Sequence, residues 1–325
     1  MKVLIAIRGW FKSDDKTLDV DIGPRFTRAI QNYGWEAHYH RLPWPYANDY
    51  SGTIEACREI RPDVLLWDDD YILNPAELLE RRSFMSAVRL LGVKIVPVYL
   101  DGWALREAVV REASKDVDAI WAVLPSFSFW NTLGVPVLHF PIPHGVVIEP
   151  DDTKPIKASF CGRIAGHHKG RLEFMGEGSP IEWDISDFKN EDKDPLQAYA
   201  NYMARLGRSG AALSFCMRWL RSERVVTDRV FEAPLAGALL IQEYAPCVAH
   251  FMKAGQHFLE FTTPADLREI LNFIEAKPEE AKAIRRAGHE HVVASYCDQS
   301  IIKQFEGLLN RCGQLQACQA SPAVA

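Results

Sequence analysis

The sequence predicts an α/β protein built from two doubly wound domains, and three observations lead to this prediction. Short apolar runs of strand length alternate with amphipathic stretches of helical period along the chain. This alternation breaks around residues 141–155, where prolines and acidic residues form the best linker candidate in the sequence. A length of 325 residues with a hydrophobic content of 48% allows two domains of ordinary size, each with its own core.

The first half contains six segments with the length and composition of strands, at residues 2–7, 35–42, 63–67, 93–100, 119–124 and 136–140. Helical segments are expected at 22–33, 53–60 and 126–133. The first strand is apolar throughout after Lys2, which is typical of a strand buried on both faces. Gly9 and Trp10 follow it in a loop, where the glycine either makes a plain turn or lets a ligand approach the backbone. The pattern predicts a Rossmann-like domain over residues 1–150.

The second half repeats the alternation, with strands expected at 158–161, 181–185, 211–215, 238–241 and 257–261. Helices are expected at 196–206, 264–274, 278–293 and 298–309. We therefore assign residues 151–312 to a second Rossmann-like domain, whose last helix is free to pack back on the first domain. Residues 313–325 lack apolar periodicity, so we expect a disordered tail there.

Composition narrows the classes of function. A formal net charge of −6 disfavours a general nucleic-acid binder, which would carry a basic stripe. The seven cysteines form no CxxC pair and are odd in number, so neither a zinc ribbon nor a disulfide framework is indicated. The apolar run near the N-terminus is too short for a signal peptide, and no run approaches the length of a membrane span. We expect a cytoplasmic protein without an integral membrane segment.

The stretch at residues 227–246 carries the most chemical information. Arg229 and Glu232 are three residues apart, so they share one face of a short helix that Asp228 is placed to cap and Gly237 to end. The apolar run 238–241 then has the length of a buried strand. A charged pair just before a buried strand either holds a ligand at the rim of a parallel sheet or forms an ordinary surface salt bridge.

This stretch resembles the "glycosyl transferases group 1" domain of CgeB-like proteins, a family of GT-B glycosyltransferases. Its core reads approximately R-x-F-E-A-x-x-x-G, and Arg229, Phe231, Glu232, Ala233 and Gly237 fall in that order and spacing. The resemblance extends over about residues 159–295. It implies two Rossmann-like domains facing across a cleft, with a nucleotide-sugar donor held by the second domain and an acceptor, such as a glycan, presented by the first.

Gly162, Arg163 and Lys169 form a second candidate. Two cations near a strand-to-helix turn make either a clamp for a diphosphate or a basic surface, because the amides of such a turn already favour an anion. The resemblance implies the clamp, since these residues look like the Gly-Arg and Lys positions that neutralise the donor diphosphate in the family. With two fixed cations in that role, we expect no metal and no cofactor.

The resemblance also implies that Glu232 accepts from the ribose hydroxyls and that Tyr244 and Pro246 form part of the donor-pocket wall. One position departs from the family pattern. Enzymes with an E-x7-E motif carry a glutamate eight residues before the second one, and this chain has Arg224 there. How the sugar ring is held, and whether the reaction retains or inverts the anomeric configuration, therefore stays open.

An inverting reaction needs a general base, and two aspartates qualify by position. Asp101 and Asp68 each follow an apolar strand, and the carboxyl ends of strands face the ligand crevice in doubly wound sheets. Either residue also suits a helix cap. The run at residues 68–70 invites comparison with the DxD metal motif of GT-A enzymes, although it lies outside any GT-A context.

The sequence thus predicts a metal-independent glycosyltransferase that uses a nucleotide-sugar. The alternative from another class is a catalytically silent relative that binds a sugar or a partner protein, which the arginine at position 224 suggests. A hydrolase or kinase has no support, because a Ser/His/Asp order, a nucleophile elbow, a P-loop and HExxH are all missing from the sequence.

Overall fold

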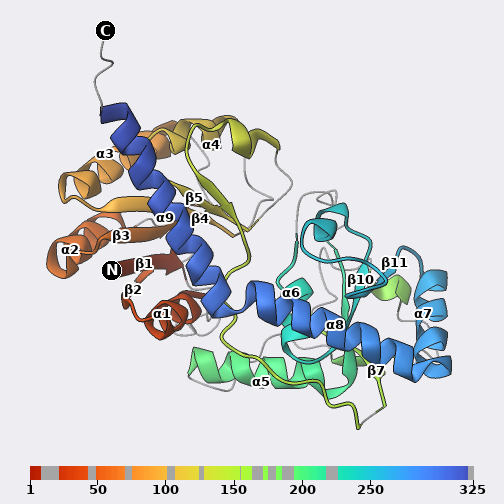
Figure 1. Cartoon of the computed structure of the whole chain (residues 1–325). Helices are drawn as coiled ribbons and strands as arrows, with labels where there is room; N and C mark the ends of the chain where they lie inside the picture. Colours follow the sequence, from red (N-terminus) through yellow and green to blue (C-terminus); the bar gives the residue numbers. More distant parts are fainter. Residues whose placement is uncertain are drawn as a thin grey trace. The chain divides into compact units, whose positions relative to one another are not determined.

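The computed structural model describes residues 1–8, 22–42, 49–69, 75–100, 107–123, 128–153, 155–162, 171–174, 181–184, 194–216 and 226–320 (Figure 1). The chain divides into two compact units. The first comprises Met1–Pro143 together with Asp298–Ala325, and the second comprises His144–Cys297. Within the described residues, no helix combines the length and the apolar character needed to cross a membrane.

The first unit contains a parallel sheet of six strands. They are β1 (Lys2–Arg8), β2 (Glu36–Leu42), β3 (Val64–Asp68), β4 (Lys94–Tyr99), β5 (Ile120–Ala122) and β6 (Val137–His139). Their order is β2-β1-β3-β4-β5-β6, and each neighbouring pair is parallel. The central strand β3 is buried at every residue, as its apolar sequence predicts.

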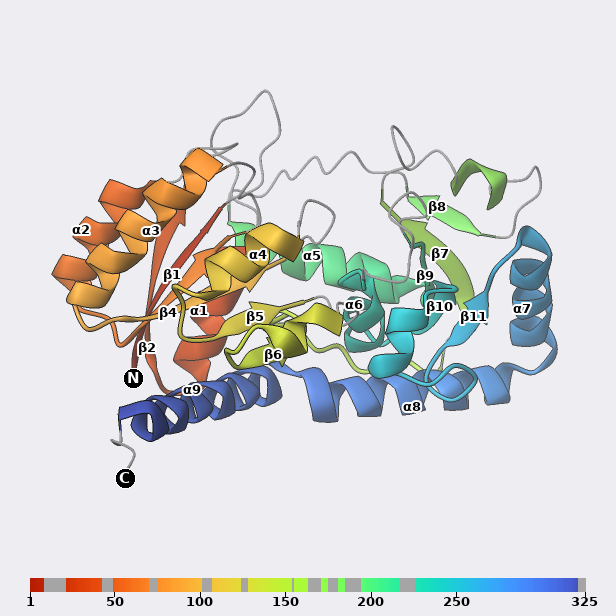
Figure 2. The ribbon, with the colours of Figure 1, turned by 90° about the horizontal axis from the view of Figure 1, so that it is seen from above.

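Helices cover both faces of this sheet (Figure 2). One face carries α1 (Ile22–Asn32) and α9 (Asp298–Ala320), whose apolar side chains join those of β1 and β3 in one core cluster. The other face carries α2 (Tyr50–Ile60), α3 (Pro75–Leu90), α4 (Glu107–Ser114) and the short 3-10 helix η2 (Ser128–Thr132). The two-sided burial explains why the strands read as continuous apolar runs.

The second unit contains a parallel sheet of five strands. They are β7 (Lys157–Cys161), β8 (Glu182–Asp184), β9 (Gly210–Ser214), β10 (Leu239–Glu243) and β11 (Leu259–Phe261), in the order β11-β10-β9-β7-β8. Its helices are α5 (Pro195–Arg208), α6 (Arg229–Leu235), α7 (Pro264–Ala276), α8 (Pro278–Tyr296) and the 3-10 helix η5 (Pro246–His250). Pro195, Pro264 and Pro278 each begin a helix, where the missing N–H of proline costs nothing.

Both sheets share one topology. In each, the second strand in sequence lies on one side of the first, and the third strand lies on the other side. The direction of the chain across the sheet therefore reverses between β1 and β3, and again between β7 and β9. In open α/β sheets, ligands bind at the carboxyl ends of the strands at such a reversal. The residues after β3 and after β7 are thus the first places to look for a site.

Two boundaries differ from the sequence-based expectation, and the last helix lies with the first unit, as that expectation allowed. The first unit ends at Pro143 and not at residue 150, because the acidic stretch that reads as a linker is bonded into the second unit: Ile148 N donates to Leu235 O at 2.7 Å. Helix α9 belongs to the first unit and continues to Ala320, so the tail expected to be disordered from residue 313 is helical over residues 313–320. Gln, Leu and Ala dominate that segment, and their helix propensity extends the helix where apolar periodicity stops.

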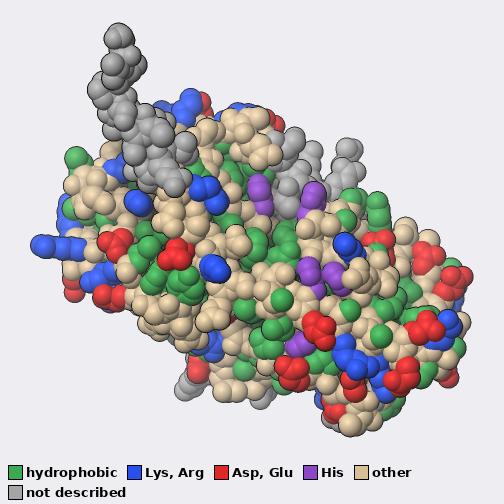
Figure 3. Space-filling model, in the orientation of Figure 1, with side chains coloured by type: hydrophobic (Ala, Val, Ile, Leu, Met, Phe, Trp, Pro, Cys, Tyr) green, Lys and Arg blue, Asp and Glu red, His purple; other side chains and the backbone are tan. Residues whose placement is uncertain are grey.

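Charged side chains of both signs occur on the described part of the face shown in Figure 3. There, acidic and basic side chains lie among one another (Figure 3). At the start of α8, lysines and glutamates form local ion pairs. Lys277 Nζ lies 3.0 Å from Glu280 Oε1, and Lys282 Nζ lies 2.9 Å from Glu279 Oε1. Exposed pairs of this kind contribute little to stability, so they give no functional signal.

Candidate functional site

The reversal between β7 and β9 begins at Gly162, directly after the last residue of β7. Gly162 has a φ of +152°, a region that residues with side chains rarely adopt. A Cβ at this position would lie 3.1 Å from Phe160 Cζ and 3.4 Å from Arg229 Nη2. Glycine is therefore needed for two reasons, its backbone conformation and the close approach of an arginine.

Two arginines lie against the same aromatic ring beside this glycine. The guanidinium carbon of Arg229, the first residue of α6, is 5.3 Å from the ring centroid of Phe160. The guanidinium carbon of Arg171 is also 5.3 Å from that centroid, and 5.6 Å from the ring centroid of Phe215. The two guanidinium groups are therefore close to each other, because both lie 5.3 Å from the centroid of the same ring. The faces of aromatic rings attract cations, which helps to hold both guanidinium groups at the edge of the sheet.

The surroundings of Arg171 disfavour its charged form and so lower its pKa. Burial, and after it the like charge of Arg229, lower the pKa of Arg171 to about 10. Glu243 opposes this shift; it ends β10, is 4% exposed, and accepts a hydrogen bond from Cys216 N at 3.0 Å. Glu243 beside Arg171 and Glu232 beside Arg229 balance the two arginine charges at this edge. The guanidinium groups are nevertheless the kind of donor that binds a phosphate or carboxylate in a charged hydrogen bond.

The local sequence explains how α6 holds Arg229 and Glu232. The backbone amides of Phe231 and Glu232 both donate to Asp228 O, at 2.8 and 2.9 Å. Asp228 occupies the N-cap position with helical dihedral angles and makes no side-chain capping hydrogen bond, which differs from the expected side-chain cap. Gly237 has a φ of +71° and follows the last turn, as expected of a helix stop.

Glu232 is almost fully buried, at 7% exposure, and tyrosines bind both of its carboxylate oxygens. Tyr199 donates to Oε1 at 3.1 Å, and Tyr202 donates to Oε2 at 2.9 Å. Arg229 Nη2 in turn donates to the Tyr202 hydroxyl at 3.4 Å. The charged pair that the sequence places on one helical face is therefore bridged by a tyrosine from α5.

Tyr244 and Pro246 lie at the same edge of the sheet, just beyond β10. The backbone amide of Tyr244 donates to Phe261 O at 2.7 Å, which fixes the chain there while the side chain stays 48% exposed. Pro246 begins η5. A half-exposed aromatic side chain at the carboxyl end of the sheet is suited to contact the apolar part of a ligand.

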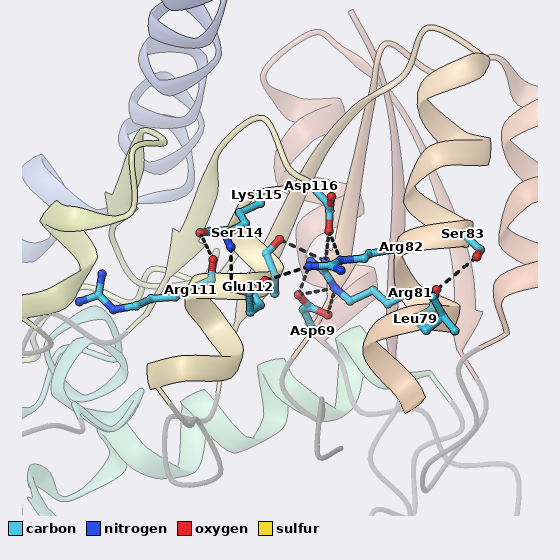
Figure 4. A network of polar contacts seen from close by, with 11 residues as sticks. Asp69, Leu79, Arg81, Arg82, Ser83, Arg111, Glu112, Ser114, Lys115 and Asp116 are labelled. Atoms are coloured by element: carbon cyan, nitrogen blue, oxygen red, sulfur yellow. Dashed lines mark hydrogen bonds and ion pairs between the residues drawn. The ribbon is translucent and has the colours of Figure 1, made fainter. Parts of the chain in front are cut away.

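In the first unit, the carboxyl end of β3 is anchored by a buried ion pair (Figure 4). Arg81 of α3 is 0% exposed and donates from Nε to both oxygens of Asp69, at 3.0 and 3.1 Å, and from Nη2 at 2.7 Å. Tyr99 also donates to Asp69, at 2.9 Å. Burial works to lower the pKa of Arg81, but the attraction of Asp69 outweighs it and holds that pKa above its ordinary value.

This anchor bears on the acidic run at residues 68–70. Asp69 is committed to a structural ion pair, whereas Asp68, the last residue of β3, is buried at 4% exposure at the strand end where the sequence predicts it. Among the side chains that the structure describes, no three carboxylate, histidine or cysteine groups are placed to hold a metal ion. Gly9, Trp10, Asp70, Asp101, Arg163 and Lys169 lie outside the described residues.

From the predicted set, the structure brings together Gly162, Arg229 and Glu232, while Tyr244 and Pro246 follow β10 at the carboxyl end of the same sheet. Sequence reasoning missed three participants, which are Arg171, Tyr199 and Tyr202. A signal existed for each: Arg171 follows Lys169 by two residues, and the two tyrosines are three residues apart on the expected helix 196–206. Without the fold, neither signal points to Arg229.

Comparison with known proteins agrees with this architecture. Residues 157–307 match the family model described as "Glycosyl transferase-like". No curated protein matches the chain. Among solved structures, HepE (Alr3699) of Anabaena in complex with UDP-glucose is similar over 96% of this chain and 100% of its own, with a TM-score of 0.58 at 10% identity.

Two further structures are similar at comparable levels. Sucrose-phosphate synthase from Thermosynechococcus elongatus covers 98% of this chain and 100% of its own, with a TM-score of 0.56 at 10% identity. A glycosyltransferase from Rickettsia africae ESF-5 covers 96% and 98%, with a TM-score of 0.59 at 9% identity. Residues 157–307 thus match a glycosyl transferase-like family model, and the shared architecture shows that the chain has the GT-B fold.

Proposed function

We propose that this protein transfers a sugar from a nucleotide-sugar donor to an acceptor glycan, and that the second unit binds the donor. The observation that carries the proposal is the pair of guanidinium groups, Arg171 and Arg229, held against the Phe160 ring at the chain reversal of the second sheet. The complex of HepE with UDP-glucose supports a donor of this class. The nucleotide base and the sugar are left to experiment.

In this reaction the bond between the anomeric carbon and the diphosphate oxygen breaks, and its electron pair leaves with the diphosphate. A hydroxyl oxygen of the acceptor forms the new bond to the anomeric carbon and gives up its proton, to an aspartate base if the reaction inverts or to the leaving diphosphate if it retains. Fixed cations lower the barrier by stabilising the charge that grows on the leaving group. Arg171 and Arg229 take this role, together with Arg163 and Lys169, and the transfer is proposed to need no metal and no cofactor.

The remaining donor contacts follow from the same edge of the sheet. Glu232, whose two oxygens the tyrosines bind, is proposed to accept from the ribose hydroxyls of the donor, as the resemblance implies. Tyr244 and Pro246 form part of the pocket wall, and Gly162 lets the diphosphate approach the backbone.

The first unit is proposed to present the acceptor, with Gly9 and Trp10, which follow β1 in the sequence, and an aspartate as general base if the reaction inverts. Asp101 is the first candidate and Asp68 the second. In an inverting enzyme, Asp101→Asn should lower turnover by about 10²–10⁴-fold and leave donor affinity nearly unchanged. Determining the anomer of the product shows whether a base is needed. An inverted product from a fully active Asp101→Asn variant transfers the role to Asp68.

A second candidate function rests on Arg224, which stands where E-x7-E enzymes carry a glutamate. In that case the protein is a catalytically silent relative that binds a sugar or a partner protein. Slow hydrolysis of a nucleotide-sugar in the absence of acceptor would exclude this candidate. Binding without turnover across many donors and acceptors would favour it over the transferase.

The cytoplasm is the proposed location. The seven cysteines of the sequence form no CxxC pair and are odd in number, which does not indicate the disulfide framework of a secreted protein.

Thermal unfolding with a panel of ligands tests the donor proposal. UDP, GDP and ADP are each compared with the matching nucleoside. A ligand at a hundredfold excess over its Kd stabilises the folded state by about 2.7 kcal/mol. We expect one diphosphate to raise the unfolding temperature well beyond its nucleoside. Equal shifts for every diphosphate and its nucleoside would remove the proposed diphosphate site.

A further inference from the structure

A row of hydrogen-bonded side chains runs through the interior of the second unit and ends at Arg229. Its members are His144, Tyr199, Glu232, Tyr202 and Arg229. His144 Nδ1 lies 3.0 Å from the Tyr199 hydroxyl, Tyr199 and Tyr202 bind the two oxygens of Glu232, and Arg229 Nη2 lies 3.4 Å from the Tyr202 hydroxyl. His144, Tyr199 and Glu232 are all buried.

The direction of each bond follows from the chemistry of the groups. An ionised carboxylate only accepts hydrogen bonds, so both tyrosine hydroxyls must donate to Glu232. Each tyrosine oxygen is then left as an acceptor on its other side. Tyr199 accepts from His144, which places a proton on Nδ1, and Tyr202 accepts from Arg229. Burial raises the pKa of Tyr202, so its hydroxyl keeps the proton that it donates.

The row has a consequence for Arg229. Burial works to lower the pKa of this arginine, but Tyr202 and then Glu232 counteract it and hold the pKa above its ordinary value. The Nε atom of Arg229 is buried and has no hydrogen-bond acceptor within the described part of the chain. Tyr202 therefore accepts a hydrogen bond that orients the guanidinium, and the Phe160 ring supports it.

We propose that Tyr202 is a positioning residue, which uses the buried charge of Glu232 to hold the Arg229 guanidinium in the orientation that binds the donor diphosphate. This inference rests on the proposed function. It gives Glu232 a second task besides any ribose contact, that of a counter-charge relayed to Arg229 through a neutral hydroxyl. Holding a flexible arginine in its bound orientation before the ligand arrives reduces the entropy lost on binding.

The chain offers a matched pair of variants for the test. Tyr202→Phe removes the hydroxyl between Glu232 and Arg229 and keeps the ring. Tyr199→Phe removes the other hydroxyl on the same carboxylate but leaves the contact with Arg229 intact. Each variant loses one donor to Glu232, so a merely structural role predicts similar effects of the two.

The measured quantity is the preference for a diphosphate, defined as the Kd of a nucleoside divided by the Kd of its diphosphate. UDP with uridine, GDP with guanosine and ADP with adenosine are titrated into each protein by calorimetry. We expect Tyr202→Phe to reduce the preference of the wild type by roughly three- to tenfold, about the worth of one hydrogen bond. Tyr199→Phe should leave it within about twofold, although both variants unfold at lower temperature.

The outcomes separate this inference from the function on which it rests. If the wild type prefers none of the three diphosphates to its nucleoside, both proposals are wrong. If the wild type shows a preference that Tyr202→Phe retains, or that both variants lose equally, only the positioning role is wrong. Should Tyr202→Phe fail to fold, Glu232→Gln replaces it: loss of the relayed charge must lower the same preference, and an unchanged preference overturns the inference.

Discussion

The orientation of the Arg229 guanidinium is set by three neighbouring residues from other parts of the chain. Arg229 is the first residue of a short helix, and there it meets Phe160 from β7, Tyr202 from α5 and the bare backbone of Gly162. Each neighbour restricts the guanidinium in a different way, by an aromatic face, by a hydrogen bond and by space. A binding arginine prepared in this manner loses little freedom when it meets its ligand.

Gly162 gives a direct test of that packing. Gly162→Ala places a methyl group 3.1 Å from Phe160 and 3.4 Å from Arg229, in a backbone region unfavourable for alanine. We expect the free energy of unfolding to fall by about 1–3 kcal/mol and the affinity for a nucleoside diphosphate to fall with it. Gly255→Ala is the control, since its φ is +74° but nothing lies within 4 Å of the added methyl group. It should cost stability without changing nucleotide affinity, and equal loss of affinity in both variants would contradict the packing argument.

The two arginines can also be tested one at a time. Replacing Arg171 or Arg229 by glutamine removes a charged hydrogen-bond donor, so each change should weaken diphosphate binding by roughly 1.5–3 kcal/mol and nucleoside binding much less. Titration calorimetry with both ligands measures the difference. Arg268→Gln on the exposed surface of α7 is the matched control. Loss of nucleoside and diphosphate affinity in equal measure would mean that these arginines do not contact the diphosphate.

At the scale of elements, α3 shows why the pattern of apolar residues in a sequence can fail to predict a helix. Its buried face contains Phe84, Met85 and Val88, and Arg81 occupies the next inward position of the same stripe. A charged residue at the start of an apolar stripe looks like a solvent-facing position in the sequence. The sequence did not suggest that Asp69, itself bound by Tyr99, would form an ion pair with Arg81, because Asp69 and Tyr99 come from other parts of the chain. Helix α3 was therefore not predicted, and neither was α4, whereas the eleven strands of the described residues were expected close to their positions.

The Asp69–Arg81 pair makes a prediction about α3. Arg81→Leu leaves Asp69 as an uncompensated buried charge, so the free energy of unfolding should fall by about 3–5 kcal/mol. Arg82→Leu is the control on the same helix: its partner Glu112, at 2.9 Å, is exposed, and such a pair is worth at most about 1 kcal/mol. Denaturant titration of both variants measures the difference. Similar small losses would show that the buried pair does not anchor the helix.

At the scale of the molecule, the alternation of strands and helices predicts the fold class. The boundary between the two units depends instead on which unit the stretch after Pro143 packs against. The stretch after Pro143 looks like a linker in composition, yet Gly237 lets it pack closely on α6, where a Cβ would lie 2.7 Å from Ile148 O. The candidate site likewise depends on contacts between distant parts of the chain. The resemblance identifies residues 229–237, but Arg171 and Tyr202 reach them only through the topology of the sheet.

Metal dependence is a property of the whole enzyme. If fixed cations stabilise the leaving diphosphate, transferase activity should persist in EDTA at a rate close to that in magnesium. A radiometric or mass-spectrometric transfer assay with and without chelator measures this. Activity that disappears in EDTA and returns with manganese or magnesium would instead move Asp68 and the residues after it into the site.

The central claim is that the second unit binds a nucleotide-sugar for transfer, and release of the nucleoside diphosphate tests it most directly. Wild-type protein, Arg171→Gln and Arg229→Gln are incubated in EDTA with a panel of UDP-, GDP- and ADP-sugars, and the diphosphate released is quantified by mass spectrometry. We predict that the wild type releases diphosphate slowly from one donor without acceptor, and that each arginine variant is at least about tenfold slower, the loss expected for a charged hydrogen bond to the leaving group. Release at equal rates by all three proteins, or no release and no binding of any donor, would contradict the account.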